Sequence, residues 1–211
     1  MDTRRTTNAS DTTDAGGPDH GRRTAGRLPI VLLVSGTIGW AASAQLVLER
    51  LALYADPDYV TTCDVSPLIS CGDVFQTAQA SLFGFPNPLI GIVAFAVVIT
   101  TAMGLLAGAR FARWYWLGLQ AGVTAGLSFV AWLWFQALFV IHILCLYCIA
   151  VWAVMLVVFV AVTAHTMSTG VLQVGPRARR VAAEWSWVIA LLLILAMAVS
   201  VVVSFADAFT G

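Results

Sequence analysis

Long runs of apolar residues dominate the sequence, and most of its polar residues lie in the segments between these runs. Three runs, at about 29–48, 88–107 and 187–205, match the roughly 20 residues with which a helix crosses the hydrocarbon core of a bilayer. A fourth run, 117–164, would be about 72 Å long as a single helix, more than twice the core thickness of about 30 Å. We therefore expect it to form two spans joined by a tight hairpin near 136–142, which makes five spans in all.

The composition agrees with a membrane environment. The chain is 60% hydrophobic and 10% charged, whereas soluble domains carry roughly 25% charged residues. The lipid bilayer is thus the expected surrounding of the chain beyond its start. Residues 1–27 contain almost no apolar side chains to bury, so we expect a disordered tail there. The formal net charge is zero, and we expect no nucleic-acid partner.

All eleven basic residues are arginines, and their positions predict the orientation of the chain. With five spans, ten of them fall on one side of the membrane and only Arg50 falls on the other. Because cytoplasmic segments are enriched in positive charge, the N-terminus and the loop 166–186 are expected in the cytoplasm. The loop 50–86, the hairpin and the tail 207–211 then face outward. Glu49 and Arg50 are interpreted as markers of the membrane interface at the end of the first span.

One competing interpretation concerns the first apolar run. The arginines before it and the small residues 42–44 resemble a secretory signal with its cleavage site. The run is as long as a membrane span, which favours a retained helix. The cysteines lie on the outer side under both interpretations.

Four cysteines form the chemical signal of the sequence. Cys63 and Cys71 lie in the long outer loop, and Cys145 and Cys148 lie near the outward start of the fourth span. Outside the cytosol thiols persist as disulfides, so these residues are interpreted as two redox pairs. The C-x-x-C spacing places both sulfurs on one face of a helix, whose positive N-terminal end stabilises the thiolate that attacks a disulfide. His142, three residues before, is interpreted either as a further thiolate stabiliser or as a polar part of the hairpin.

The two pairs suit the two ends of an electron relay. The loop pair faces water and a soluble protein, whereas the C-x-x-C pair sits at the membrane boundary and can meet a lipid-soluble oxidant. Two structural disulfides, or a metal bound by the four cysteines, remain as alternatives in a non-enzymatic membrane protein. A disulfide across i, i+3 on a helix is strained and easily reduced, which favours a carrier over a structural crosslink.

Three segments resemble the vitamin K epoxide reductase (VKOR) family. Residues 63–75 (CDVSPLISCGDVF) resemble its outer-loop signature, residues 83–91 (FGFPNPLIG) the start of its second span, and residues 145–148 (CLYC) its active-site motif. The resemblance covers about 29–165 and is greatest to actinobacterial members. It implies an all-α membrane protein: a four-helix catalytic bundle over 28–165, a short half-helix in the outer loop, and here a fifth transmembrane helix at 187–206.

The resemblance also implies roles for single residues. Cys145 and Cys148 match the active-site pair, with Cys148 reacting with a quinone, and Cys63 and Cys71 match shuttle cysteines that take electrons from a thioredoxin-fold, DsbA-like partner. A DsbB-type bundle performs the same chemistry but carries its C-x-x-C in the first outer loop, the reverse of the order found here.

Two further residues match positions that contact the quinone. Asn87 matches a residue that hydrogen-bonds a quinone carbonyl, and Phe75 matches an aromatic residue on the half-helix that caps the pocket. From the residues alone, Asn87 before Pro88 is also a suitable helix N-cap. Phe75 is equally compatible with plain packing of the loop onto the bundle.

The expected function is therefore that of a membrane thiol–quinone oxidoreductase that drives disulfide formation outside the cytosol. The expected location is a bacterial plasma (inner) membrane, and the expected cofactor is menaquinone or a related quinone. Family members often carry a fused thioredoxin-like domain after the fifth span, and the sequence ends shortly after Phe205. We therefore expect the electron donor to be a separate protein.

Overall fold

The computed structural model describes residues 20–66 and 68–205, and no β-strand occurs among them. Five long helices each contain a segment long and apolar enough to cross a membrane, as predicted: α1 (His20–Ala55), α3 (Pro88–Leu106), α4 (Arg113–Gln136), α5 (Leu146–Ser168) and α6 (Pro176–Ser204). Three short elements complete the fold, namely α2 (Cys71–Phe75), the 3-10 helix η1 (Ala78–Ser81) and the π-helical turn η2 (Ala137–Ile141).

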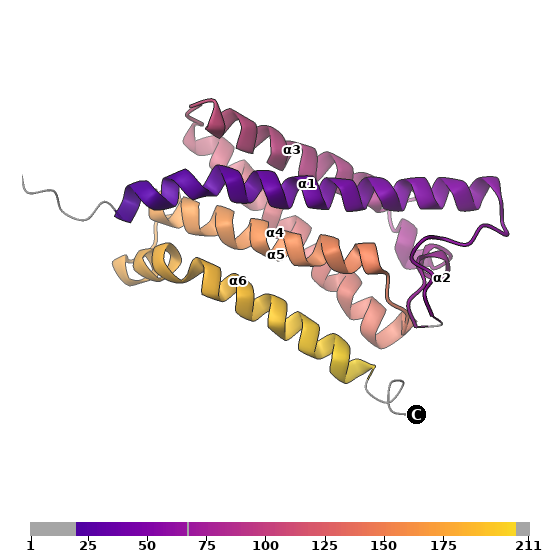
Figure 1. The fold of residues 1–211 in the computed structure, drawn as a ribbon. Coiled ribbons are helices and arrows are strands. Elements are labelled where there is room, and N and C mark those ends of the chain that lie inside the picture. Colours follow the sequence, from indigo (N-terminus) through magenta and orange to yellow (C-terminus); the bar gives the residue numbers. More distant parts are fainter. Residues whose placement is uncertain (1–19, 67, 206–211) are drawn as a thin grey trace, which may run out of the picture.

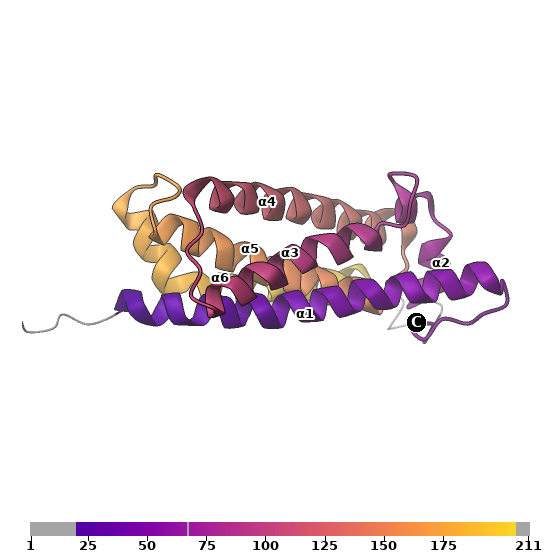
Figure 2. The same cartoon turned by 90° about the horizontal axis from the view of Figure 1, so that it is seen from above.

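Helices α1 and α5 form the centre of the bundle. Helix α1 packs against α3 and α5, and α5 also packs against α4 on one side and α6 on another. Figures 1 and 2 show α6 on the outside of this arrangement, beside α5. The expected architecture of four helices plus a fifth is confirmed.

The core of the bundle lies where the first four long helices meet. Each contributes fully or almost fully buried side chains, among them Leu32, Ala102, Val123 and Val158. Helix packing inside a membrane depends on close van der Waals contact and small residues, because lipid is as apolar as the side chains. Gly39 of α1 illustrates this: a Cβ there would lie 2.5 Å from the ring of Phe95 in α3.

The helix ends differ from the apolar pattern in one informative place. Helix α1 does not end near residue 48 but continues to Ala55, so the outer loop begins at Asp56. At about 54 Å for 36 residues, α1 exceeds the hydrocarbon thickness of about 30 Å. Residues 1–19 of the expected tail and the tail 207–211 lie outside the described residues, and residues 20–27 form the first turns of α1.

The connections between helices are sorted to two ends of the bundle. The turns from α3 to α4 and from α5 to α6 lie at one end, and α2, η1 and the turn from α4 to α5 lie at the other (Figure 1). The expected hairpin is present: η2 follows α4, and His142 after it adopts a left-handed conformation with φ 58°. This exposed residue ends the turn, and its backbone N–H donates to Ala137.

Candidate active site

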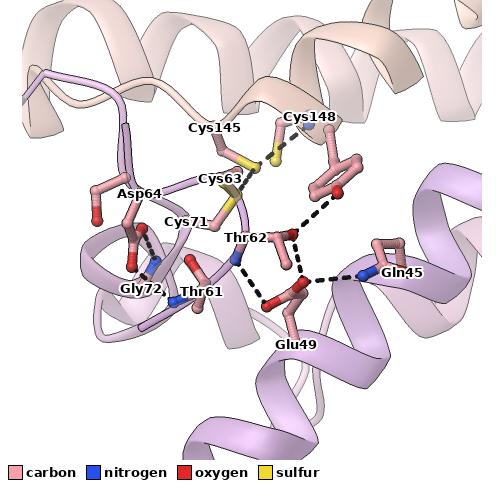
Figure 3. The surroundings of a disulfide bond; sticks show 12 residues. Gln45, Glu49, Thr61, Thr62, Cys63, Asp64, Cys71, Gly72, Cys145 and Cys148 are labelled. Atoms are coloured by element: carbon pink, nitrogen blue, oxygen red, sulfur yellow. Dashed lines mark hydrogen bonds between the residues drawn. A yellow bond between two sulfur atoms is a disulfide. The ribbon is translucent and has the colours of Figure 1, made fainter. Parts of the chain in front are cut away.

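The sulfurs of three cysteines meet at the end of the bundle that carries α2. Cys63 and Cys71 form a disulfide, and Cys71 Sγ lies 3.1 Å from Cys145 Sγ (Figure 3). Cys145 and Cys148 are free thiols. Reacting atoms about 3–3.5 Å apart are in the range of a near-attack arrangement. The expectation that the two pairs lie together is met by Cys71 and Cys145, which are 74 residues apart in the sequence.

Backbone pairing explains why these two distant sulfurs meet. The N–H of Ser70 donates to Leu144 O at 3.0 Å, and the N–H of Leu144 donates to Leu68 O at 2.9 Å. The loop residue before Cys71 is thus bonded to the residue before Cys145. This short parallel bridge sets the register of the two cysteines.

The local structure at each of these cysteines is the start of a helix. Cys145 is the N-cap of α5, and its Sγ accepts a hydrogen bond of 3.3 Å from the N–H of Cys148. The sulfur of Cys145 therefore lies at the N-terminal end of α5, where a backbone N–H points at it. On the other side, Ser70 caps α2 and accepts from the N–H of Asp73.

Asp64 braces the loop between the two bonded cysteines. Its carboxylate accepts hydrogen bonds from the N–H of Thr61 at 3.0 Å and from the N–H of Gly72 at 3.1 Å. Burial alone would raise the pKa of Asp64, but hydrogen bonds, chiefly from Thr61 and Gly72, outweigh it and lower that pKa. A Cβ at Gly72 would lie 3.1 Å from the carboxylate, so glycine allows this close approach.

A buried carboxylate that sequence reasoning did not assign to the site lies beside it. Glu49 is 2% exposed, and its oxygens accept from Gln45 Nε2 at 2.9 Å, from the N–H of Thr62 at 3.2 Å and from Thr62 Oγ1 (Figure 3). Thr62 Oγ1 is also 3.0 Å from the hydroxyl of Tyr147, which lies between Cys145 and Cys148. The role of Glu49 as a marker of the membrane interface stays a prediction; in addition, its carboxylate is buried and hydrogen-bonded to Thr62 of the loop.

Its neighbour Arg50 has the corresponding role for the second half of the loop. The guanidinium donates to Ala80 O at 3.0 Å and to Ser81 Oγ at 2.6 Å, and it lies 5.8 Å from the centre of the Phe75 ring. Arg50 is also buried, and its position at the membrane interface likewise stays a prediction. The helix-forming residues 51–55 after this pair were the available signal that α1 continues.

An apolar cavity of about 500 Å³ lies inside the bundle, between α1, α3, α4 and α5. Cys145 and Cys148 line it at one end, and it extends along α4 as far as Trp114. Gly118 and Gly122 face open space, which widens the cavity along α4. Its size and apolar lining with few polar groups are typical of sites that bind small organic molecules.

Asn87 and Phe75 both line this cavity. Asn87 stands at the N-cap position of α3, but its side chain does not cap the helix. Instead, Nδ2 donates to Gln79 O at 2.6 Å and Oδ1 accepts from the N–H of Leu82 at 3.2 Å, so the amide holds the η1 segment. The amide has a second N–H that these contacts leave available. Phe75 is buried and packs with the cysteine cluster around Cys71.

The positions of the cysteine sulfurs also test the alternative that these residues bind a metal ion. The sulfurs of Cys63, Cys71 and Cys145 lie within 4.8 Å of one another, which is close enough to share an ion. Two of them are joined in a disulfide and are not thiolates, the form in which cysteine binds a metal. The donor set in this redox state is that of a thiol–disulfide exchange site.

Comparison with known proteins agrees with this geometry. The model of the Vitamin K epoxide reductase family matches residues 30–163, more than half of the 211 residues. The matched range contains all four cysteines and extends from α1 into α5. No curated protein matches the chain. With its four cysteines placed as described and well over half of its length matched, the chain belongs to the vitamin K epoxide reductase family.

Proposed function

We propose that this protein is a membrane thiol–quinone oxidoreductase that oxidises a separate thioredoxin-fold protein and so drives disulfide formation outside the cytosol. The observation that carries the proposal is the 3.1 Å contact between Cys71 Sγ and Cys145 Sγ beside an apolar cavity lined by Cys145 and Cys148. Residues 28–165 are the proposed catalytic bundle, and α6 packs on its outside.

Electrons pass from the donor to the loop pair and then to the Cys145–Cys148 pair by thiol–disulfide exchange. A reduced donor dithiol reduces the Cys63–Cys71 disulfide and becomes a disulfide itself. The Cys71 thiolate then attacks Cys145 of a Cys145–Cys148 disulfide, and Cys148 leaves as a thiolate that takes up a proton. Cys63 attacks Cys71 in the mixed disulfide and releases Cys145. The products are a Cys63–Cys71 disulfide and a Cys145–Cys148 dithiol, which is the redox state described above.

The residues around the cavity fit a quinone, with menaquinone or a related compound as the proposed cofactor. When bound, a quinone accepts the two electrons and two protons of the Cys145–Cys148 dithiol, whose disulfide then re-forms. The apolar walls suit a prenylated ring and exclude water. The remaining N–H of Asn87 can donate to a ring oxygen and stabilise negative charge there, and Phe75 closes the cavity beside the cysteines.

The proposed orientation places the cysteine cluster on the outer face of a bacterial plasma membrane. Arg110, Arg113 and the arginines at the start of α6 lie at the end of the bundle opposite α2, whereas Arg50 lies at the cysteine end. The positive-inside rule assigns the arginine-rich end to the cytoplasm. A secreted donor would then meet the loop.

The donor can reach the loop disulfide only after the loop moves. Cys63 is 1% exposed and Cys71 is 0% exposed, so neither sulfur is open to attack by another protein in this arrangement. We assign this arrangement to the internal exchange step, because the Cys71 sulfur of the loop pair lies beside Cys145. Reaction with the donor requires an opened loop.

Purified protein, a reduced thioredoxin-fold donor and a soluble menaquinone analogue provide the test. Donor thiols are expected to disappear only when quinone is present, and quinol is expected to appear in equal amount. Cys145→Ala and Cys148→Ala are each expected to abolish the reaction, because each removes one sulfur of the pair that reduces quinone. Ser200→Ala, on α6, serves as the control with unchanged rate. Quinone-dependent thiol loss that survives both cysteine substitutions contradicts the proposed mechanism.

A further inference from the structure

We propose that Glu49 is a positioning residue for the sulfur exchange, acting through Thr62 and Tyr147. This inference rests on the proposed function and specifies which contacts hold the two cysteine pairs together. Glu49 belongs to α1, Thr62 to the outer loop beside Cys63, and Tyr147 to the C-x-x-C segment of α5. Three segments that are distant in the sequence are thus joined through one threonine hydroxyl.

The hydrogen bonds of this cluster have a defined direction. An ionised carboxylate only accepts hydrogen bonds, so Thr62 Oγ1 donates its single proton to Glu49. The contact of 3.0 Å between Thr62 Oγ1 and the Tyr147 hydroxyl must then be donated by Tyr147. Tyr147 thus donates to Thr62 and Thr62 donates to Glu49, so the protons of both hydroxyl groups are used in hydrogen bonds. Gln45 Nε2 and the N–H of Thr62 also donate to the carboxylate, and the Tyr59 side chain lies beside it.

The position of the cluster gives it a role in the exchange. Leu144 already ties the Cys71 side of the loop to α5 through backbone bonds. Thr62 ties the Cys63 side to the same helix, on the other side of the sulfur contact. Resolution of the mixed disulfide requires Cys63 to return to Cys71 while Cys71 is bonded to Cys145. The Glu49 cluster keeps the Cys63 side beside that bond.

Thr62 is itself exposed, so the tie it provides competes with water and is of moderate strength. That strength suits a contact that must hold during internal exchange and yet be released when the loop meets a donor. The loop covers the Glu49 carboxylate. When the loop moves away, water can hydrate this charge, which reduces the free energy needed to open the loop.

A crosslinking experiment measures the position of the sulfurs without donor or quinone. In a Cys71→Ala, Cys148→Ala background, only Cys63 and Cys145 remain, and their sulfurs lie within 4.8 Å of each other. Diamide oxidises them to one disulfide at a rate that reports how closely the Cys63 side of the loop is held to α5. Thr62→Val keeps the shape of the side chain and removes the hydroxyl; we expect crosslinking to slow about fivefold, the loss typical of one ordinary hydrogen bond. Thr62→Ser is expected to restore the rate. Thr100→Val, an exposed threonine on α3, is the matched control with no change.

Tyr147→Phe and Glu49→Ala provide independent variants. Each is expected to slow crosslinking, and Thr62→Val combined with Tyr147→Phe is expected to be no slower than the slower single variant, because both remove the same link. In the otherwise unaltered protein, Thr62→Val is expected to lower turnover while the KM for quinone stays the same. Unchanged crosslinking rates in both Thr62→Val and Tyr147→Phe would overturn the inference. Absence of quinone-dependent thiol oxidation in the unaltered protein would instead overturn the proposed function.

Discussion

At the scale of single residues, the chemistry of this protein depends on side chains that hold sulfurs in place. Cys145, the proposed reactive thiol, is the N-cap of α5, so its position is fixed by the start of a helix. Asp64 performs the bracing on the opposite side, where it spans the loop from Thr61 to Gly72. Neither role requires contact with a substrate.

The lowered pKa of Asp64 predicts a pH dependence of the loop. A group whose pKa is depressed in the folded state contributes stability that is complete above its unfolded pKa of about 3.9 and is lost as the pH falls through the folded value. Protonation removes the acceptor for the N–H groups of Thr61 and Gly72. We therefore expect reduction of the loop disulfide by a water-soluble phosphine to become faster below about pH 4, relative to the Asp64→Asn variant.

The Asp64→Asn variant is the reference for the rate of disulfide reduction. Asp64→Asn retains one acceptor oxygen and no ionisable group, so its loop disulfide should be reduced faster than normal at neutral pH and show no acceleration in acid. Asp58→Asn, an exposed change in the same loop, should behave as the unaltered protein does. Identical acid profiles for Asp64→Asn and the unaltered protein would contradict the assignment of the pKa to this contact.

At the scale of elements, α1 carries more than a membrane span. Its C-terminal turns present Glu49 to the cysteine loop and Arg50 to the η1 segment, so consecutive residues hold both halves of the loop between α1 and α3. Inside the bundle, the same helix packs on α3, where Gly39 lies against Phe95. The packing of α1 on α3 therefore fixes the position of the helix end to which the cysteine loop is hydrogen-bonded.

Gly39→Ala tests this packing. A Cβ placed 2.5 Å from the buried Phe95 ring forces α1 and α3 apart, and overpacking of this kind costs about 1–3 kcal/mol. A lower midpoint of thermal unfolding in detergent is the expected result. Gly26→Ala, on the same helix, has no atom within 4 Å of the added carbon and is expected to leave the midpoint unchanged. Equal midpoints for the two variants would show that this contact is not close.

At the scale of the whole molecule, the two ends of the bundle differ in charge and in chemistry. One end carries the cysteine cluster and Arg50, and the other carries the turns rich in arginine. The apolar cavity connects the cysteine end to the interior of the bundle. Under the proposed function, electrons enter at the cysteine end and leave through the cavity inside the bundle.

Labelling of intact cells measures the orientation directly. In a variant whose four cysteines are replaced by alanine, Asp58→Cys should react with a membrane-impermeant maleimide, because Asp58 is exposed in the outer loop. Ala109→Cys, equally exposed in the turn between α3 and α4, should react only after the membrane is permeabilised. The opposite labelling pattern would place the cysteine cluster in the cytoplasm and contradict the proposed direction of electron flow.

The sequence by itself determined the five helical spans, the hairpin before Cys145 and the position of the C-x-x-C motif at a helix start. These features depend on local hydropathy and on the length of a helix per residue, and both can be read directly from the order of the residues. Family motifs added the expected roles of loop and active-site cysteines, and they singled out Asn87 and Phe75, which both line the cavity; their contact with a quinone stays a prediction.

Only the tertiary structure decided which sulfur of each pair meets the other, and which groups hold them there. The contact of Cys71 with Cys145 follows from backbone bonds between Leu144 and a loop 74 residues earlier in the chain, a pairing without local sequence signal. Glu49 looked like a charge at the edge of a span because its partner Thr62 is reached only when the loop folds back. Asn87 likewise has the sequence of a helix cap but bonds η1, since the folded loop offers its amide better partners.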